Sequence, residues 1–401
     1  MTTVPDARTC EDVTSFTSEI PDMSGVRLAV FSDTYAPQVN GVARTLERLV
    51  KAIQSSGGSV GVFTAADPAA PYDDASITRF PSRAFWAYPQ VRLAWPSNRN
   101  VFEAFDAFRP NLVHLATEFG VGLAGRRSAI RRDVPIVSSY HTNFTAYAKH
   151  YGLGAFAAPG WRYLQWFHSA AQRTFCPTQA VADDLVLHRF ERPAVWSRGV
   201  DTRQFSPARR STAWRDQAGA AGETLLALYV GRLAAEKGLD VAIEGVRRAA
   251  ERRPSRIRML VVGDGPAEAQ ARATAPDCVL FAGRLQGISL QSAYASGDVF
   301  LFPSTTDTFG NVMLEAMASG LPVIGADVGP TREVLAPGCG WLEPPGSAEH
   351  IADRLIQLID DRALLAGARA SALSVAASRS WDAVWTSLFR SYLQVMDAHR
   401  R

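Results

Sequence analysis

With 401 residues, the chain is too long for one ordinary hydrophobic core, and two domains are expected. Its composition, 47% hydrophobic and 20% charged, is that of a soluble globular protein, and a formal charge of +3 gives no case for nucleic acid as a partner. No apolar run approaches the ~20 residues that a membrane-spanning helix needs, and no signal-peptide pattern opens the chain. The scattered cysteines, without metal-like spacing, predict reduced buried thiols in a cytoplasmic protein: Cys10, Cys176, Cys278 and Cys339.

Short β-branched or aromatic runs alternate with helical patterns after a polar lead-in, residues 1–24, that is expected to be disordered. A first series of strands is expected at 27–33, 59–64, 112–116, 135–140 and 173–177. A second series is expected at 225–231, 258–263, 279–283, 299–303 and 322–326. Alternation at this spacing predicts an α/β fold with parallel sheets and right-handed crossovers.

The chain is therefore expected to form two doubly wound, Rossmann-like domains facing one another across a cleft. The predicted boundaries are 1–24 for the lead-in, 25–197 for the first domain, 198–380 for the second and 381–401 for a final crossover helix. Segment 196–222, rich in Gly, Ser, Ala and charge, is interpreted as the interdomain linker. The final helix carries a near-heptad apolar stripe that has to bury one face, and the first domain is its expected partner. Ligands in such sheets bind beyond the carboxyl ends of the strands.

Polar residues follow three expected strands of the first domain. The first strand leads through Tyr35 to Asn40 and Gly41, whose unhindered backbone N–H groups could meet a phosphate or an acceptor. Glu118 and His141 each follow another strand of the same series. A lone His is more often a structural hydrogen-bonding residue than a catalyst. Because His141 lies at the carboxyl end of a strand, before a polar loop, the structural and the catalytic interpretation are equally favoured for it. Tyr35, Asn40 and Glu118 are the acceptor-side candidates.

A basic cluster lies on one expected helix of the first domain: Arg126, Arg127, Arg131 and Arg132. An aromatic-rich segment, Phe85-Trp86-Ala-Tyr88, and Trp95 lie nearby in sequence. A solvated helix face is favoured for the arginines. The alternative is contact with anionic lipid head groups.

Two cations, Arg232 and Lys237, follow the first expected strand of the second domain and are flanked by Gly231 and Gly238. Cations five residues apart at a strand's carboxyl end are well placed to grip a diphosphate, with solvated surface charges as the alternative. The later turn Gly263-Asp-Gly-Pro lacks the third glycine of a dinucleotide fingerprint and is interpreted as structural.

Two carboxylates flank a helix start in the segment Pro303–Asp327. Gly310 opens a predicted helix over 311–319, whose free N–H groups and positive dipole end favour an anion. Asp307 precedes that start, and Glu315 lies one and a half turns inside the helix. The spacing suits a nucleotide sugar, in which two hydroxyl-rich rings flank a diphosphate. An ordinary βαβ unit with solvated acids is the alternative.

In chain order these motifs resemble those of GT-B glycosyltransferases, specifically the retaining family four. The resemblance runs from Arg27 to Met396 and rests on five motifs: Asn40-Gly41, His141-Thr-x-Phe144, Arg198-Gly-Val-Asp201, Gly231-Arg232…Lys237-Gly238 and the carboxylate pair. One departure is Asp307, because the family usually has Glu at this position.

The resemblance implies a role for each site residue and no metal or other cofactor. Arg232 and Lys237 would neutralise the leaving diphosphate, Glu315 would bind the ribose hydroxyls, and His141 would contact the sugar near its reacting carbon. Gly41 would approach the diphosphate from the first domain, and the end of the strand at Phe281 would read a base edge. Donor sugar and distal phosphate would be held by Asp307 and the backbone of Phe309, Gly310, Asn311 and Val312.

Within the family, the segments 141–153 and 306–311 look most like those of bacterial mannosyltransferases, which use GDP-mannose and lipid or glycolipid acceptors. UDP-sugar-dependent sulfoquinovosyl- and glucosyltransferases share much of this pattern and stay open as an alternative. A nicotinamide-dependent oxidoreductase would need a G-x-G-x-x-G run that the chain lacks. A two-domain ligand-binding protein without catalysis would require a signal peptide. The implied partners are a nucleotide-sugar donor, a lipid or glycan acceptor and the anionic inner face of the cell membrane.

Overall fold

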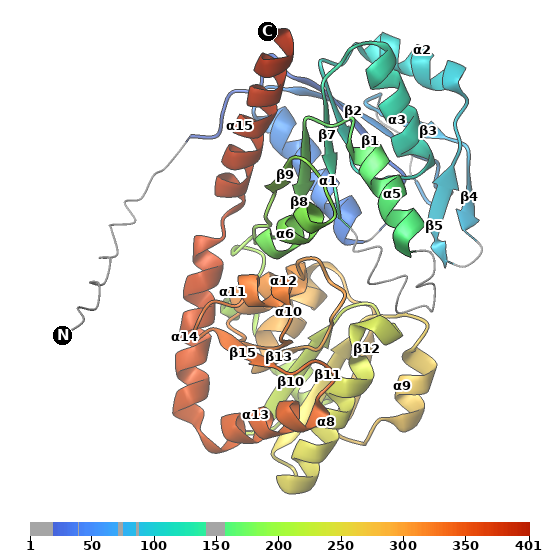
Figure 1. Cartoon of the computed structure of the whole chain (residues 1–401). Coiled ribbons are helices and arrows are strands. Elements are labelled where there is room, and N and C mark those ends of the chain that lie inside the picture. Colours follow the sequence, from blue (N-terminus) through green and yellow to red (C-terminus); the bar gives the residue numbers. More distant parts are fainter. Residues whose placement is uncertain (1–18, 39, 71–74, 86–87, 142–156) are drawn as a thin grey trace, which may run out of the picture.

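A computed structural model of the chain contains two parallel β-sheets, each surrounded by helices (Figure 1). It describes residues 19–38, 40–70, 75–85, 88–141 and 157–401. The expected α/β class with two Rossmann-like domains is confirmed.

The first sheet has the strand order β3-β2-β1-β6-β7-β8-β9, and all neighbours in it are parallel. Its strands are β1 (Arg27–Ser32), β2 (Ser59–Ala65), β3 (Ile77–Phe80), β6 (Leu112–Leu115), β7 (Ile136–Ser139), β8 (Arg173–Cys176) and β9 (Pro193–Val195). All five strands predicted for this series are confirmed. The edge strands β3 and β9 were missed because they are short and only partly buried, so no continuous apolar run marks them.

Helices and a hairpin complete the first domain. The helices are α1 (Gly41–Ser55), α2 (Asn98–Phe108), α3 (Gly120–Arg131), α5 (Ala157–His168) and α6 (Gln179–Leu187). An antiparallel hairpin of β4 (Ser82–Phe85) and β5 (Tyr88–Ala94), which the sequence did not predict, lies outside the main sheet.

The second sheet has the order β12-β11-β10-β13-β14-β15, again all parallel. Its strands are β10 (Leu225–Val230), β11 (Ile257–Val262), β12 (Val279–Gly283), β13 (Val299–Phe302), β14 (Val323–Ala326) and β15 (Gly340–Glu343). The helices around it are the 3-10 helices η2 (Pro207–Arg209) and η3 (Ala235–Lys237), and α7 (Thr212–Gln217), α8 (Leu239–Arg252), α9 (Glu268–Thr274), α10 (Gly287–Ser296), α11 (Asn311–Ala318), α12 (Gly329–Val334), α13 (Ala348–Asp360) and α14 (Arg362–Ser378). The five strands predicted here are confirmed, and only β15 was missed.

Both faces of each sheet are buried. On β1, Leu28 and Val30 belong to one hydrophobic cluster, whereas Ala29 and Phe31 belong to another. Successive side chains of a strand point to opposite faces, so each face of the sheet has its own core. This two-sided burial explains why the strands appear in the sequence as continuous apolar runs.

Two segments for which the sequence predicted no packing, the linker and the lead-in, contribute residues to the hydrophobic cores. Within the predicted linker 196–222, Phe205, Ala218 and Ala220 are buried in a cluster of the second domain, and η2 and α7 form there. The two alanines lie in this core although the segment has the composition of a loop. In the predicted lead-in, Met23 is fully buried under α1, while residues 1–18 lie outside the described part of the chain.

The last helix, α15 (Trp381–Arg400), packs on the first domain, whereas α14 before it runs along the second (Figure 1). Its apolar stripe joins the cluster of β1, and the Tyr392 hydroxyl lies 2.6 Å from Nδ1 of buried His114. Arg173 of β8 donates hydrogen bonds to Ser391 and Gln394 on the same helix. The end of the chain therefore ties the two domains together.

Candidate active site

Loops that follow the strands of the two sheets touch one another between the domains. Thr308, after β13, donates from Oγ1 to the backbone oxygen of His141, after β7, at 3.0 Å. Thr178, after β8, donates to the backbone oxygen of Thr308 at 3.3 Å. The carboxyl edges of both sheets thus face each other, and we call the residues gathered there the interdomain site.

The start of α11 has the geometry of an anion-binding helix end. Gly310 has φ +80°, and a Cβ there would lie 2.7 Å from the Phe302 ring and 2.8 Å from Met313, so only glycine fits. No side chain caps the helix, which leaves its first N–H groups open. Phe309 is buried in the core and Val312 packs partly against it, and both anchor the turn.

The start of α1 lies opposite α11. Asn40 caps this helix, because its Oδ1 accepts from Ala43 N at 2.8 Å while its Nδ2 donates to Thr34. A Cβ on Gly41 would lie 3.8 Å from Nδ2 of Asn311, so the two domains approach each other closely here. The Oδ1 of Asn311 is buried and accepts no hydrogen bond within the described residues. Two helix N-termini with positive dipole ends therefore meet at the interdomain site.

Both predicted cations are held by carboxylates. Lys237 Nζ lies 2.8 Å from Oδ1 of Asp307, and Arg232 forms an ion pair with the buried carboxylate of Glu236. The pair of Lys237 and Asp307 joins two motifs that the sequence had treated separately. Glu236 was missed, although its place four residues after Arg232 on one turn was the available signal.

Glu315 is almost fully buried, with 8% of its surface exposed. The hydroxyl of Tyr294 on α10 donates to its Oε2 at 3.0 Å. Burial raises the pKa of Glu315, and the charges of Arg44 and Arg48 on α1 act against that rise from the other domain. One carboxylate oxygen is thus fixed by Tyr294, a residue that the sequence gave no reason to select.

His141 is held from its Nδ1 side by Arg198, whose Nη2 lies 3.1 Å away. Burial first, and then the nearby charge of Arg198, hold the pKa of His141 well below its ordinary value of 6.5. The imidazole is therefore neutral at physiological pH and acts through hydrogen bonds. The rest of the motif that His141 opens, from Thr142 to Leu153, lies outside the described residues.

Both halves of the chain match glycosyltransferase families. Residues 39–204 match Glycosyltransferase Family 4, and residues 224–361 match Glycosyl transferases group 1. A GDP-mannose-dependent alpha-mannosyltransferase of Mycobacterium tuberculosis is 33% identical over 92% of this chain and 97% of that protein. The chain belongs to glycosyltransferase family 4. The sulfoquinovosyl transferase SQD2 of Arabidopsis thaliana is 30% identical over 81% of this chain and 64% of its own.

The fold of this glycosyltransferase is GT-B. The solved structure of Anabaena HepE in complex with UDP and glucose has a TM-score of 0.72 to it, at 20% identity, and the match covers 92% of this chain and 99% of that one. The predicted recognition, fold class and enzyme class are therefore confirmed.

The three acceptor-side candidates of the glycosyltransferase differ in burial and in their hydrogen bonds. Tyr35 is buried in the core under α1, which leaves little of its ring for an acceptor. Asn40 is engaged as the helix cap. Glu118 lies partly buried between β6 and α3, with its Oε1 3.4 Å from Nε2 of His168 and its backbone oxygen accepting from Tyr163. Of the three, only Glu118 has a carboxylate, and that side chain is partly accessible.

Asp33, at the end of β1, is a buried carboxylate that the sequence did not select. It accepts hydrogen bonds from Val121 N at 3.1 Å and from the Thr117 hydroxyl at 2.7 Å, and so holds the loop of Glu118 against the start of α3. Burial raises its pKa from 3.8 to about 6, against the lowering effect of these hydrogen bonds.

Asp33→Asn is expected to flatten part of the pH dependence of stability. Because the pKa of Asp33 is raised in the fold, the folded wild type binds the proton more tightly than the unfolded chain. Its free energy of unfolding should therefore fall as pH rises from about 4 to 6, by about 3 kcal/mol. Urea denaturation at several pH values should show a fall of this size in the wild type that the variant lacks.

The matched control is Asp106→Asn. Arg132 lowers the pKa of Asp106, so this carboxylate stabilises the wild type increasingly as pH rises up to about 4, and the stability gap between wild type and variant should widen over that range, the opposite sign. Parallel wild-type and Asp33→Asn curves between pH 4 and 6 would contradict the raised pKa of Asp33.

On β12, the ring centre of Phe281, the residue expected to read a base edge, lies 4.7 Å from the guanidinium carbon of Arg272. Gly263 in the neighbouring turn has φ +140°, and a Cβ there would lie 1.9 Å from the backbone oxygen of Gly231. The turn thus packs against the loop that carries Arg232. This packing agrees with its interpretation as a structural turn.

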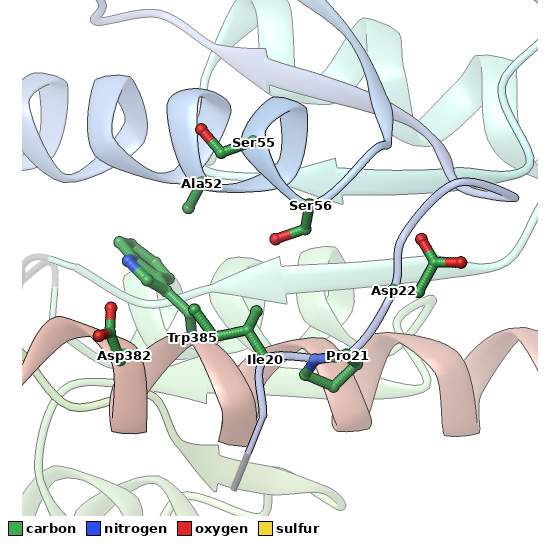
Figure 2. Close-up of a pocket in the computed structure, with 8 residues that line it drawn as sticks. All are labelled: Ile20, Pro21, Asp22, Ala52, Ser55, Ser56, Asp382 and Trp385. Carbon is green, nitrogen blue, oxygen red and sulfur yellow. The ribbon is translucent and has the colours of Figure 1, made fainter. Parts of the chain in front are cut away.

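One cavity lies away from the interdomain site. It has a volume of about 470 Å³ and is lined by the chain from Ile20 to Asp22, the end of α1, and Asp382 and Trp385 of α15 (Figure 2). The start of α1 faces α11, so its far end lies on the opposite side of the first domain. With two acidic side chains and no basic one in its lining, this cavity is unsuited to a nucleotide diphosphate.

Other sequence predictions concern thiols, metals and membranes. Cys176, Cys278 and Cys339 are buried and unpaired, and Cys10 lies outside the described residues. In the described ranges no three His, Cys, Asp or Glu side chains are grouped as metal ligands. None of the helices seen there is both long and apolar enough to cross a membrane.

Proposed function

We propose that this glycosyltransferase moves mannose from GDP-mannose to a hydroxyl group of a lipid or glycan, with retention of the anomeric configuration. The carrying observation is the interdomain site itself, where two helix N-termini, two cations and the buried carboxylate of Glu315 converge. This set matches a donor with a diphosphate beside a ribose diol. The choice of mannose rests on the mycobacterial relative, which is GDP-mannose-dependent.

Each residue has a proposed role in the transfer. The free oxygen of Glu315 accepts hydrogen bonds from the ribose hydroxyls, and Asp307 with the start of α11 binds the sugar and the distal phosphate. Arg232 and Lys237 neutralise the leaving diphosphate, so their charge and the helix ends do the work of a metal ion. The bond from the anomeric carbon to the diphosphate breaks as the acceptor oxygen bonds to the same face. The acceptor's proton passes to the leaving phosphate.

Domain motion is part of this proposal. A Cβ added at Gly41 would already touch Asn311, so a diphosphate that reaches both helix ends has to part the two loops. Opening and closing of the domains about their connecting segments is the ordinary way in which such a site admits its ligand.

The base of the donor is tested by calorimetric titration. GDP is expected to bind at least about tenfold more tightly than UDP, a difference of about 1.4 kcal/mol. UDP-sugars are the second candidate, because the solved GT-B structure with the same fold holds UDP. Tighter binding of UDP than of GDP would overturn the GDP-mannose proposal. Assays with GDP-mannose and UDP-glucose in the presence of lipid extract would then identify the sugar.

We also propose contact with an anionic membrane through the α3 patch. This patch is formed by the exposed apolar residues Trp95, Phe119, Ile130 and Trp166 with the exposed cations Arg127 and Arg131. On α3, positions 119, 127, 130 and 131 follow helical spacing and so share one face. The patch adjoins Glu118, whose backbone oxygen accepts from Tyr163, and Tyr163 in turn packs beside Trp166.

Only part of the basic cluster is available to lipid. Arg132 is ion-paired with Asp106, and Arg126 stacks on Trp166 at 4.2 Å while donating to two backbone oxygens of α5. Arg127 and Arg131 are therefore the cations to which the lipid proposal assigns a role. A solvated helix face remains the alternative interpretation of Arg127 and Arg131.

Arg127→Glu combined with Arg131→Glu is expected to weaken binding to anionic vesicles by about tenfold or more, because each basic residue near such a surface contributes about 1 kcal/mol. Vesicle flotation measures the bound fraction. The control reverses two exposed arginines of the second domain, Arg203 and Arg209, with the same change in net charge. Equal losses in both double variants, or no binding by the wild type, would remove the α3 patch as a membrane contact.

A further inference from the structure

Arg198 is a buried cation without a carboxylate partner. Only 5% of its surface is exposed, and within the described part of the chain it forms no ion pair. Its Nη1 donates to the backbone oxygens of Trp196 and Ser197, and its guanidinium lies 4.7 Å from the Trp196 ring centre. Burial lowers its pKa to about 10, which leaves it charged at neutral pH. Burying a charge among neutral groups is costly, so the one hydrogen bond that Arg198 makes to a side chain of the described residues needs an explanation.

That hydrogen bond is with His141. Nη2 of Arg198 lies 3.1 Å from Nδ1 of the imidazole. A guanidinium has only donors, so Nδ1 has to be the acceptor. In a neutral imidazole the proton is then on Nε2. The geometry of Arg198 therefore selects one of the two tautomers of His141.

The other nitrogen is left ready for a ligand. Nε2 of His141 is buried and has no hydrogen-bond partner among the described residues. A buried N–H without an acceptor costs about 1–3 kcal/mol, so its persistence points to a partner that binds there. The backbone oxygen of the same residue accepts from Thr308, the neighbour of Asp307. His141 thus lies beside the loop to which the sugar of the donor is assigned.

We propose that Arg198 is a positioning residue, which keeps Nδ1 of His141 an acceptor so that Nε2–H donates a hydrogen bond to a hydroxyl of the donor sugar. The proposal rests on the proposed function for the identity of that ligand. The tautomer itself can be measured without any donor. Arg198 acts only through His141 and touches no substrate.

The groups that act on the charge of His141 are Arg198, His114 and His168. His114 is itself neutral, because burial lowers its pKa to about 3. His168 is linked to Glu118 through its Nε2 at 3.4 Å and to Ser138 through its Nδ1. None of these other groups is hydrogen-bonded to the ring of His141, so Arg198 is the residue that distinguishes its two nitrogens.

Arg198→Met and Arg198→Gln separate hydrogen bonding from charge. The Met side chain has no donor, so the neutral imidazole should sample both tautomers, and kcat is expected to fall by about 10- to 100-fold. The Gln amide can still donate to Nδ1 and should keep kcat within about threefold of the wild type. Nitrogen-15 NMR of histidine-labelled full-length protein reports the tautomer directly. It should show the Nε2–H form in the wild type and the Gln variant, and a mixture in the Met variant.

The pH dependence of kcat distinguishes a positioning role from a structural defect, which would lower kcat equally at every pH. Protonated imidazole carries hydrogen on both nitrogens, so the ratio of the kcat of Arg198→Met to that of the wild type should rise toward acid pH. The matched control is Arg192→Met, an exposed arginine of the same domain, which should change neither quantity.

An Nδ1–H tautomer in the wild type would overturn the proposal, whatever the donor proves to be. So would an Arg198→Met variant that keeps both the Nε2–H form and the wild-type kcat. If Arg198→Met does not fold, the wild-type spectrum and the Gln variant still decide, since a Gln variant with lost Nε2–H character contradicts the donor role. Failure of GDP-mannose as the substrate would leave the NMR result unchanged and would show itself in the titration with GDP.

Discussion

Glu315→Gln is expected to lower kcat/KM for the nucleotide sugar by at least about a hundredfold while the protein stays as stable as the wild type. Two charge-assisted hydrogen bonds to the ribose diol, each worth about 1.5–3 kcal/mol, lose their charge in this variant. Burial raises the pKa of Glu315, so the folded state carries its negative charge at a cost at neutral pH. Gln removes that cost and can still accept from the Tyr294 hydroxyl, and the free energy of unfolding should hold or rise.

The matched control for this prediction is Asp298→Asn. Asp298 is also a buried carboxylate of the second domain, but its ion pairs with Arg210, Arg215 and Arg369 overcome burial and lower its pKa. This variant should lose stability and keep kcat/KM. Steady-state kinetics and urea denaturation of both variants test these opposite expectations, lost kcat/KM with kept stability for Glu315→Gln and the reverse for Asp298→Asn. A Glu315→Gln enzyme within threefold of wild-type kcat/KM would show that Glu315 does not hold the ribose.

Lys237→Ala is expected to lower kcat by about 10²–10³-fold, with a smaller change in KM. Negative charge grows on the leaving diphosphate as the bond to the sugar breaks, so a cation placed there acts mainly on the transition state. In the structure Lys237 is paired with Asp307 at 2.8 Å, and both side chains are partly exposed. The stability lost with this pair should therefore be small, below about 1 kcal/mol.

Lys51→Ala is the matched control, because Lys51 forms an ion pair of the same 2.8 Å length with Glu47 on the exposed side of α1. It should change neither kcat nor KM. Initial rates over a range of donor concentrations separate the two constants. A Lys237→Ala variant with unchanged kcat and raised KM would assign the lysine to ground-state binding only.

Local sequence patterns predicted the parts of the site that lie within one motif. The helix after Gly310 was predicted to begin at Asn311, where α11 begins, because the glycine turn and the apolar periodicity act over a few residues. The ten predicted strands were found for the same reason, since two-sided burial makes each a continuous apolar run. The composition of segment 196–222 did not reveal that Phe205, Ala218 and Ala220 pack into a core, because small residues serve both loops and close packing.

What the sequence by itself determined is the set of chemical groups: the open helix end at Gly310, the cations Arg232 and Lys237, the carboxylates Asp307 and Glu315, and His141. What only the tertiary structure decided is which group touches which. Lys237 meets Asp307 across 70 residues, Tyr294 meets Glu315 across 21 and Arg198 meets His141 across 57. Periodicity and turn chemistry act over a few residues, whereas these contacts depend on how strands far apart in the chain are ordered in two sheets and how the sheets face each other.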